Sequence, residues 1–549
     1  MEHRSALRKV VKDCSQRGLY VASKWASELL LSYHTSLHSD TSLGRRFSLD
    51  TSSPVSDAYE EPPITEEEED LFMIARAHYD AKEHERVDFL LRNCKHPRAR
   101  FLGLYCRFLV KVKPDIRNID AHPPSPVNDD LNDILEQLEG VIDPFLIFLK
   151  GVILKGLIRK AEALECAVLS LRAYPWNWSC WTLLREVVDD YDVVAPAYLF
   201  QIDRLRPLLP KHPMTKLFIL SVMIDGHAMS PDLEEELDEM LQLFPESLYL
   251  KTLRARYAYS LRDYEAAVKL FGEVRELDPF RTDDVDTYSN ILYTMKKQAE
   301  LSQLAQHFIG VNKDRPEVSL AIGNYYSLRN EHEKAVKYYH RAVNLDPTYG
   351  AAWTLMGHEY LEMKNSHAAI EAYRRGVDIN KKDYRAWHGL GQAYELLDMP
   401  QYSLHYFQRS TALRWPYDIR MWKALAKTYH SLERYAEAIE CYKRALIGAN
   451  KDDTSSYHAL AQLYEQIGEA NEAAAYHRRC VDIGQRAGKP IHTFSKDAIE
   501  LARYEMLKGW FEGDMILAKE YLEMIATSNC AEVKEAEDLL RVWKKFVVE

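Results

Sequence analysis

Residues 352–380 have the sequence AWTLMGHEYLEMKNSHAAIEAYRRGVDIN, and residues 386–414 have the sequence AWHGLGQAYELLDMPQYSLHYFQRSTALR. When the two segments are written one under the other, tryptophan, glycine, tyrosine and several small residues fall in the same columns. These columns continue from Ser319 to Cys480, where the repeats keep register at a period of about 34 residues. Chance similarity does not maintain such a register, so this stretch decides the fold.

Each column has a role in packing. Small residues let two helices approach closely, and large side chains fill the space between helices and between repeats. The order W-x2-L-G-x2-Y followed by A-x3-F is typical of the tetratricopeptide repeat, a pair of antiparallel helices. The columns contain Trp353, Trp387, Trp422 and Tyr457, then Gly323, Gly357, Gly391, Ala426 and Ala461, and then Tyr339, Tyr373, Phe407, Tyr442 and His477. We expect these columns to form core.

The whole chain is predicted to be all-α, a tetratricopeptide-repeat superhelix (α-solenoid) of roughly a dozen helix pairs. Outside the best repeats the columns are degenerate, as at Trp181, which follows the helix-ending Pro175. The predicted parts are a degenerate helix pair at 1–34, an acidic and Ser-rich disordered linker at 35–68, degenerate repeats at 69–285 with a Pro-rich insert near 112–128, near-consensus repeats at 286–484 and capping helices at 485–549.

Composition and motifs argue against several classes of function. The net charge of −12 disfavours nucleic acid as the main ligand, which needs a basic face. The eight cysteines form no C-x2-C pair, and Glu362 stands where an H-E-x-x-H motif begun by His358 needs its second histidine. We therefore expect no catalytic residue, no metal site and no cofactor. Without a signal peptide or a long apolar run, the chain is expected to be soluble and intracellular, with reduced cysteines.

A peptide groove is the site that this architecture favours. The first helix of each repeat is expected to line the concave side, and the position after the Gly/Ala column faces inward. An asparagine there can donate to and accept from a peptide backbone, and glutamates nearby suit an arginine. The predicted groove residues are Asn290, Asn324, His358, Glu359, Glu362, Gln392 and Glu395. We expect the Asn324 side chain to lie off the packing columns.

The segments around this groove resemble a known family. They are DTYSNILY from Asp286, GNYYSLR from Gly323 and the stretch from Ala352 to Arg414, with a weaker match in GLYVASKWASELL from Gly18. They are similar to subunit 8 of the anaphase-promoting complex (cyclosome). The chain departs from the pattern at Trp415, where the family's turn usually has proline.

The resemblance implies a non-catalytic scaffold of a cell-cycle ubiquitin ligase, located in the nucleus and cytoplasm. It implies homodimers formed through the N-terminal repeats, stacking on sister repeat subunits, and a groove that takes the coactivator's N-terminal arginine-containing box. Asn324, with either Glu359 or Glu362, is then expected to contact that box. We expect an apolar edge at the N-terminus to form the dimer surface. Its predicted residues are Tyr20, Trp25, Leu29 and Leu30.

Two other classes of function stay open at this point. The first is a generic tetratricopeptide adaptor or cochaperone that binds another protein's terminal peptide. A cochaperone that clamps an acidic C-terminal peptide needs inward lysines and arginines, whereas this groove has mainly Asn, His, Gln and Glu. A repeat-bearing glycosyltransferase needs an α/β domain, for which the chain shows no alternating strand and helix pattern. Regulation by phosphorylation is expected in the linker and insert. The candidate sites are Ser48, Ser53 and Ser125.

Overall fold

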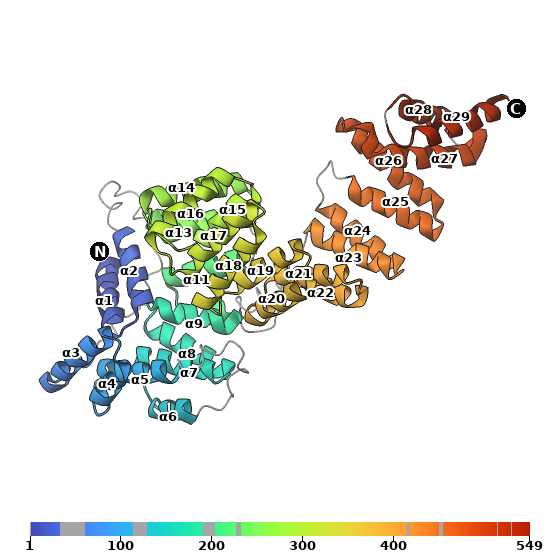
Figure 1. The fold of residues 1–549 in the computed structure, drawn as a ribbon. Helices are drawn as coiled ribbons and strands as arrows, with labels where there is room; N and C mark the ends of the chain where they lie inside the picture. The colour runs from blue at the N-terminus through green and yellow to red at the C-terminus, as the bar shows by residue number, and fades with distance from the viewer. Residues whose placement is uncertain are drawn as a thin grey trace. The chain divides into compact units, whose positions relative to one another are not determined.

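The computed structural model describes residues 2–32, 61–112, 129–189, 204–226, 232–413, 418–448, 454–512, 514–528 and 530–548. Every regular element in these ranges is a helix, which confirms the predicted all-α class (Figure 1). None of the described helices has the length and apolar character needed to cross a membrane. The predicted phosphorylation sites Ser48, Ser53 and Ser125 lie outside the described residues, as does most of the predicted linker.

The first of two compact units spans residues 1–349. Its helices are α1 (Glu2–Gln16), α2 (Tyr20–Ser32), α3 (Glu66–Asp80), α4 (His84–Leu91), α5 (Pro97–Val112), α6 (Asp129–Gln137), α7 (Pro144–Gly156), α8 (Lys160–Ala173), α9 (Trp178–Asp189), the 3-10 turn η3 (Arg206–Leu208), α11 (Pro213–Asp225), α12 (Asp232–Leu243), α13 (Leu248–Ser260), α14 (Tyr264–Leu277), α15 (Val285–Thr294), α16 (Gln298–Val311), α17 (Pro316–Leu328) and α18 (His332–Leu345).

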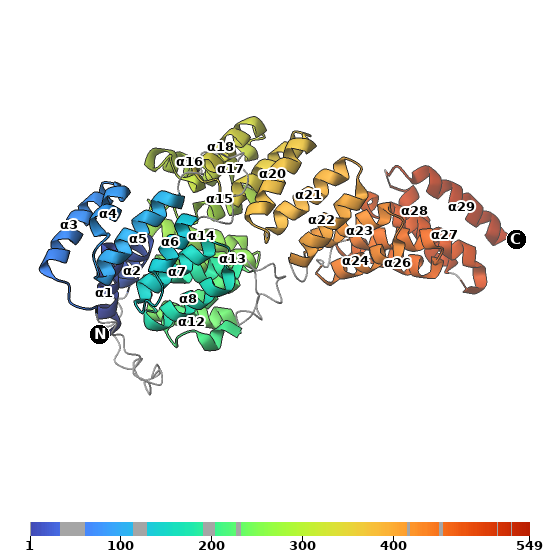
Figure 2. The same cartoon turned by 90° about the horizontal axis from the view of Figure 1, so that it is seen from below.

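The second unit spans residues 350–549, and its helices follow one another as successive pairs (Figure 2). They are α19 (Gly350–Glu362), α20 (Ser366–Ile379), α21 (Tyr384–Leu396), α22 (Pro400–Leu413), α23 (Ile419–Ser431), α24 (Tyr435–Ile447), α25 (Ser455–Ile467), α26 (Ala470–Arg486), the 3-10 turn η4 (Ile491–Thr493), α27 (Ser495–Glu512), α28 (Met515–Ala526) and α29 (Val533–Val548). The division at 349/350 falls inside the predicted run of near-consensus repeats, which begins at 286.

The turn inside each helix pair repeats as regularly as the core columns. One residue of each turn has a left-handed backbone, with φ of 60° at Asn330, 58° at Lys364, 56° at Asp398 and 59° at Glu433. The next turn has glycine at this column, Gly468. At Asn330 and Lys364 the N–H donates to the carbonyl three residues earlier at 2.9 Å, which ends the first helix of the pair.

The predicted columns are packed as their sequence indicates. Tyr373 is fully buried between Gly357 and Gly389, where an added Cβ would lie 2.6 and 2.3 Å from its ring. Gly323 under Tyr339 gives the same close approach. Because real Cβ atoms do not approach so closely, glycine is needed at these positions for the ring to enter.

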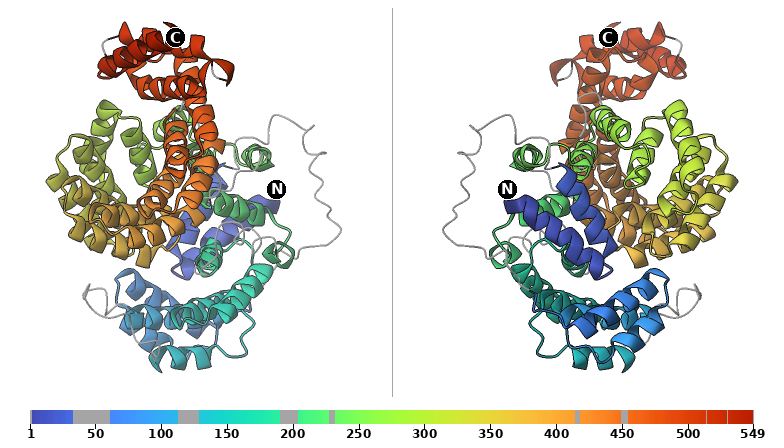
Figure 3. Two further views of the ribbon diagram at one scale, coloured as in Figure 1. Left: turned by 90° about the vertical axis from the view of Figure 1, so that its right-hand side faces the viewer. Right: turned by 90° about the vertical axis from the view of Figure 1, so that its left-hand side faces the viewer.

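The predicted N-terminal dimer surface is wrong in its central residues. Trp25 is only 8% exposed, because its ring stacks on Trp178 at 4.3 Å and meets the edge of Tyr249. Leu29 is buried in the same cluster, and Leu30 is half-buried against it. Figure 3 shows α1 and α2 beside helices much later in the same unit. The chain thus covers Trp25 and Leu29 with its own residues, whereas Tyr20 remains 51% exposed.

Candidate peptide-binding surface

Asn324 on α17 lies inside the helical stack. Its Nδ2 donates to Ser289 Oγ and to Asn290 Oδ1, both at 2.8 Å, and its Oδ1 accepts from the Tyr339 hydroxyl at 2.7 Å. The side chain is 2% exposed, so the prediction that it lies off the packing columns is wrong. The reason is that the tyrosine column puts a buried hydroxyl against this position, and the hydroxyl needs an acceptor.

Asn290 on α15 is the more accessible partner of this pair. Its side chain is half-buried, and its Oδ1 accepts from Asn324. The structure therefore brings these two predicted groove residues together at one hydrogen bond. Of the two, only Asn290 retains surface that a ligand can reach.

His358 on α19 repeats the arrangement in the second unit. Its Nδ1 lies 2.6 Å from the Tyr373 hydroxyl, and its ring meets Tyr373 edge to face. Burial, reinforced by Arg385, lowers the pKa of His358 to about 4. The imidazole is therefore neutral near pH 7, and its Nδ1 accepts from the tyrosine.

Gln392 on α21 occupies the same column and is exposed. Its counterpart in the tyrosine column is Phe407, which has no hydroxyl to satisfy. The sequence indicates core positions for Tyr339 and Tyr373 and does not show that their hydroxyls bond to Asn324 and His358. For these three repeats the change from tyrosine to phenylalanine at Phe407 was the available signal. It does not extend to Tyr442, because Lys427 at the equivalent position is exposed and pairs with Glu395.

His358 is expected to make the free energy of unfolding depend on pH. Between its folded pKa of about 4 and an unfolded value near 6.5, the unfolded chain binds a proton that the folded chain does not. The contribution of His358 to the free energy of unfolding is therefore fully present above about pH 6.5. It falls as the pH is lowered, by about 2 kcal/mol from near pH 7 to near pH 5. Urea unfolding of His358→Gln, which keeps an acceptor for Tyr373, is expected to lose this component. The exposed His405→Gln serves as control, and equal acid sensitivity of both variants would contradict the assignment.

The two candidate glutamates of α19 differ in exposure. Glu359 is 5% exposed, whereas Glu362 is exposed to solvent. Burial and the carboxylates of both glutamates raise the pKa of Tyr373, so Tyr373 stays a hydroxyl donor. An arginine from outside can reach Glu362 without displacing core, and it cannot reach Glu359 in this way.

The groove is less acidic around Glu395 than its sequence indicates. The carboxylate of Glu395 pairs with Lys427 Nζ at 2.7 Å. A shallow hollow next to this pair is lined by Glu395, Lys423, Ala424, Lys427, Tyr442, Ser455 and Ala459. Two lysines against one glutamate leave this part of the surface cationic.

Comparison with protein families gives matches in two parts of the chain. The family described as anaphase promoting complex subunit 8 / Cdc23 matches residues 2–255. Tetratricopeptide repeat families match residues 316–349, 350–383 and 417–486. The first match covers the degenerate N-terminal helices. In that region the resemblance seen in the sequence rests on one short segment that begins at Gly18.

Curated relatives extend the match through the repeats. The chain is 34% identical over 443 residues to the anaphase-promoting complex subunit CDC23 of Saccharomyces cerevisiae, covering 67% of this chain and 70% of that protein. It is 37% identical over 395 residues to the anaphase-promoting complex subunit 8 of Arabidopsis thaliana, covering 66% of each. The human cell division cycle protein 23 homolog is 36% identical over 305 residues, which are 53% of this chain and 47% of that protein.

A solved structure supports the fold over nearly the full length. The crystal structure of the APC/C hetero-tetramer Cut9-Hcn1 aligns with a TM-score of 0.56 and 16% identity, covering 98% of this chain and 96% of the other. At that identity the likeness shows the fold alone. The extended sequence match to the yeast protein and the family match to the N-terminal helices agree, and the chain belongs to the anaphase promoting complex subunit 8 / Cdc23 family.

Proposed function

We propose that this chain is a non-catalytic scaffold subunit of the anaphase-promoting complex, a cell-cycle ubiquitin ligase, acting in the nucleus and cytoplasm. The observation that carries the proposal is the 443-residue match to a yeast subunit of that complex. The architecture supports it, because stacked helix pairs present long surfaces to other proteins.

The assembly that we propose has two parts, a homodimer through the N-terminal third and stacking on sister tetratricopeptide subunits. With Trp25 and Leu29 buried, the dimer surface must use other residues. Large apolar side chains remain exposed on the N-terminal helices, which single-chain packing does not explain. They are Val21, Leu31, Met73, Ile74 and Phe89. The fold relative Cut9 was crystallised in a hetero-tetramer, and we extend assembly of that kind to this chain.

The groove of the second unit is proposed to take the coactivator's N-terminal arginine-containing box. Glu362 is the carboxylate that we assign to the arginine, because it is exposed and Glu359 is buried. Gln392 is exposed, and Phe407 in the tyrosine column has no hydroxyl to bond to it. Its amide can therefore donate to and accept from a peptide backbone. This pairing of an accessible carboxylate with an accessible amide supports an extended cationic peptide as ligand.

A second candidate function is a tetratricopeptide adaptor or cochaperone for an acidic terminal peptide. The hollow with Lys423 and Lys427 favours it, since two ammonium groups suit carboxylates. Family membership makes the first function the stronger proposal.

One co-purification experiment tests the proposal. Cells carry two differently tagged copies of the chain, either wild type or with Glu362→Lys or Glu371→Lys in both copies. Glu371 on α20 is also exposed, so its reversal matches the change in charge. All three forms are expected to retain the second copy and the other repeat subunits. Only Glu362→Lys is expected to lose the coactivator, by at least about tenfold, because the arginine then meets a like charge.

The failures are distinguishable. If the wild-type chain retains no other subunit of the complex, the scaffold proposal is wrong. If the complex is intact and Glu362→Lys holds the coactivator as well as Glu371→Lys does, the assignment of the groove is wrong. Absence of the second tagged copy contradicts the homodimer alone.

A further inference from the structure

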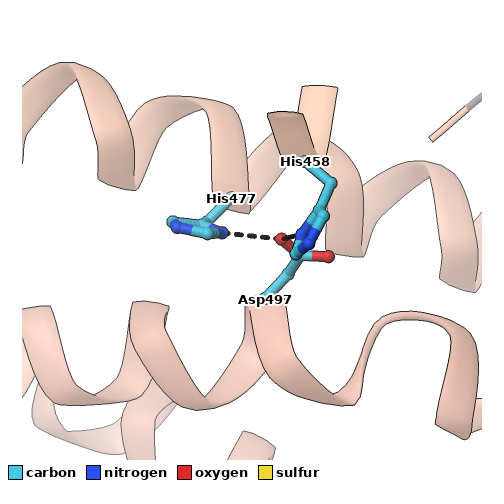
Figure 4. Close-up of side chains that lie close together, drawn as sticks. All are labelled: His458, His477 and Asp497. Carbon is cyan, nitrogen blue, oxygen red and sulfur yellow. Dashed lines mark hydrogen bonds and ion pairs between the residues drawn. The ribbon is translucent and has the colours of Figure 1, made fainter. Parts of the chain in front are cut away.

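Three side chains from three consecutive helices converge near the C-terminal end of the second unit. His458 lies on α25, His477 on α26 and Asp497 on α27. The Nδ1 atoms of both histidines lie 2.7 Å from the same oxygen, Oδ1 of Asp497 (Figure 4). His477 and Asp497 are 3% and 2% exposed, whereas His458 is half-buried and opens toward solvent.

The outer nitrogen of each histidine is held by a further side chain. His477 Nε2 lies 3.0 Å from Glu465 Oε1, and His458 Nε2 lies 3.0 Å from the Gln462 amide. Both rings are thereby fixed with Nδ1 pointing inward. Metal-binding histidines in proteins are oriented in this way, with the second nitrogen bonded to a carboxylate or another polar group.

A fourth donor stands beside the carboxylate. Cys480 on α26 is buried, and its Sγ lies 3.1 Å from Oδ2 of Asp497. Two imidazole nitrogens, a carboxylate oxygen and a thiolate sulfur form a donor set that Zn²⁺ accepts in tetrahedral geometry. The sequence alone predicts no metal site, because these four residues form no local motif.

The spacing of the ligand atoms fits a metal ion. The two Nδ1 atoms and the Asp497 oxygen all lie within 4.8 Å of one another, and the Sγ of Cys480 lies outside this group. Ligands bound to zinc at about 2.0–2.3 Å lie roughly 3–4 Å apart, so small side-chain shifts are sufficient for these three atoms, and a larger movement of the Cys480 side chain completes the site.

The repeat pattern itself breaks at this point. His477 occupies the column that holds Tyr339, Tyr373, Phe407 and Tyr442 in the preceding repeats. Packing alone calls for an aromatic ring without charge in that column, as in the buried Tyr373. His477 instead places a ring nitrogen that can bind a metal next to the buried carboxylate of Asp497.

We propose that His458, His477, Asp497 and Cys480 bind one zinc ion, which joins the last repeat to the C-terminal helices. The ion takes the two Nδ1 lone pairs, one carboxylate oxygen and the sulfur. Binding releases the thiol proton, and each neutral imidazole coordinates through an unprotonated Nδ1 with its single proton at Nε2. Because α26 packs on both α25 and α27, the ion fixes how the C-terminal helices close the stack. This site does not depend on the proposed coactivator groove.

The full-length chain, freed of any tag and stripped with a chelator, is titrated with Co²⁺ and with Zn²⁺. One equivalent of Co²⁺ is expected to give the visible bands of a tetrahedral site and a thiolate charge-transfer band in the near ultraviolet. Zinc is expected to displace it and to raise the melting temperature, because it binds only the folded state. Absence of stoichiometric binding to the folded wild-type chain overturns the proposal.

Variants assign the ligands. Asp497→Asn and His458→Gln are expected to weaken zinc binding by more than about 100-fold, and the outer change Glu465→Gln by about 10–100-fold. Cys480→Ser is expected to lose the charge-transfer band. His430→Gln is the control, because His430 on α23 bonds to the exposed Gln466 amide, contacts the Tyr435 ring and lies outside the cluster. Should Asp497→Asn fail to fold, the more exposed His458→Gln decides, and wild-type affinity in that variant overturns the proposal.

Discussion

Replacing Trp181 with alanine is expected to destabilise the first unit by about 3–5 kcal/mol. The side chain on α9 is fully buried, and its ring packs on Phe218 of α11 at 5.0 Å. Its indole N–H donates to the Pro175 carbonyl at 2.7 Å. The substitution therefore leaves a large cavity and a buried carbonyl that has lost its donor.

Trp387 provides the matched comparison for this prediction. It belongs to the same column, and its indole N–H donates to the Lys381 carbonyl at 2.8 Å, again six residues earlier. Trp387 is only half-buried, so its loss is expected to cost clearly less than that of Trp181. Because a chain of two units need not unfold in one step, hydrogen exchange of α9 and α21 measures each local cost. Equal loss of protection in the two variants would contradict the role of burial.

The repeat core could be predicted from the sequence because its contacts are periodic. Tyr373 contacts Gly357 and Gly389. Gly357 belongs to the Gly/Ala column, and Gly389 lies two residues before Gly391 of the same column. A contact that recurs at a fixed spacing can be recognised without coordinates. The same holds for Trp181, whose position after Pro175 marked the column in a degenerate repeat.

Contacts between distant segments could not be predicted in this way. Trp25 stacks on Trp178 and meets Tyr249, although no repeat spacing relates these residues. An apolar helix edge in the sequence has the same pattern whether another chain or its own chain covers it. The cluster of His458, His477 and Asp497 could not be predicted for a similar reason, because its members come from three helices and form no local motif.

The sequence predicts which residues follow the Gly/Ala column, but it does not predict whether their side chains are buried or exposed. The sequence indicates that Asn324, His358 and Gln392 occupy equivalent places. Their accessibility differs with the residue that the next helix places against them. Tyr339 and Tyr373 bond to Asn324 and His358 through their hydroxyls, whereas Phe407 has no hydroxyl to bond to Gln392. Exposure therefore differs among residues that the repeat makes equivalent.

Asn324→Ala is expected to destabilise the first unit by about 1–3 kcal/mol, because the buried Tyr339 hydroxyl loses its acceptor. Ser289 and Asn290 lose their donor in the same change. The equivalent Gln392→Ala is expected to change stability by no more than about 0.5 kcal/mol, since Gln392 is exposed and faces a phenylalanine. Urea unfolding combined with hydrogen exchange of α17 and α21 measures both.

A double-mutant cycle separates the hydrogen bond from the loss of packing. Tyr339→Phe alone leaves Asn324 Oδ1 without its donor, whereas Tyr339→Phe together with Asn324→Ala leaves no buried partner of that bond unpaired. The double variant is therefore expected to be more stable, by about 1 kcal/mol, than the sum of the two single effects predicts. Strict additivity would mean that the Tyr339 hydroxyl and Asn324 do not depend on each other. The cost of Asn324→Ala would then come from its bonds to Ser289 and Asn290 alone.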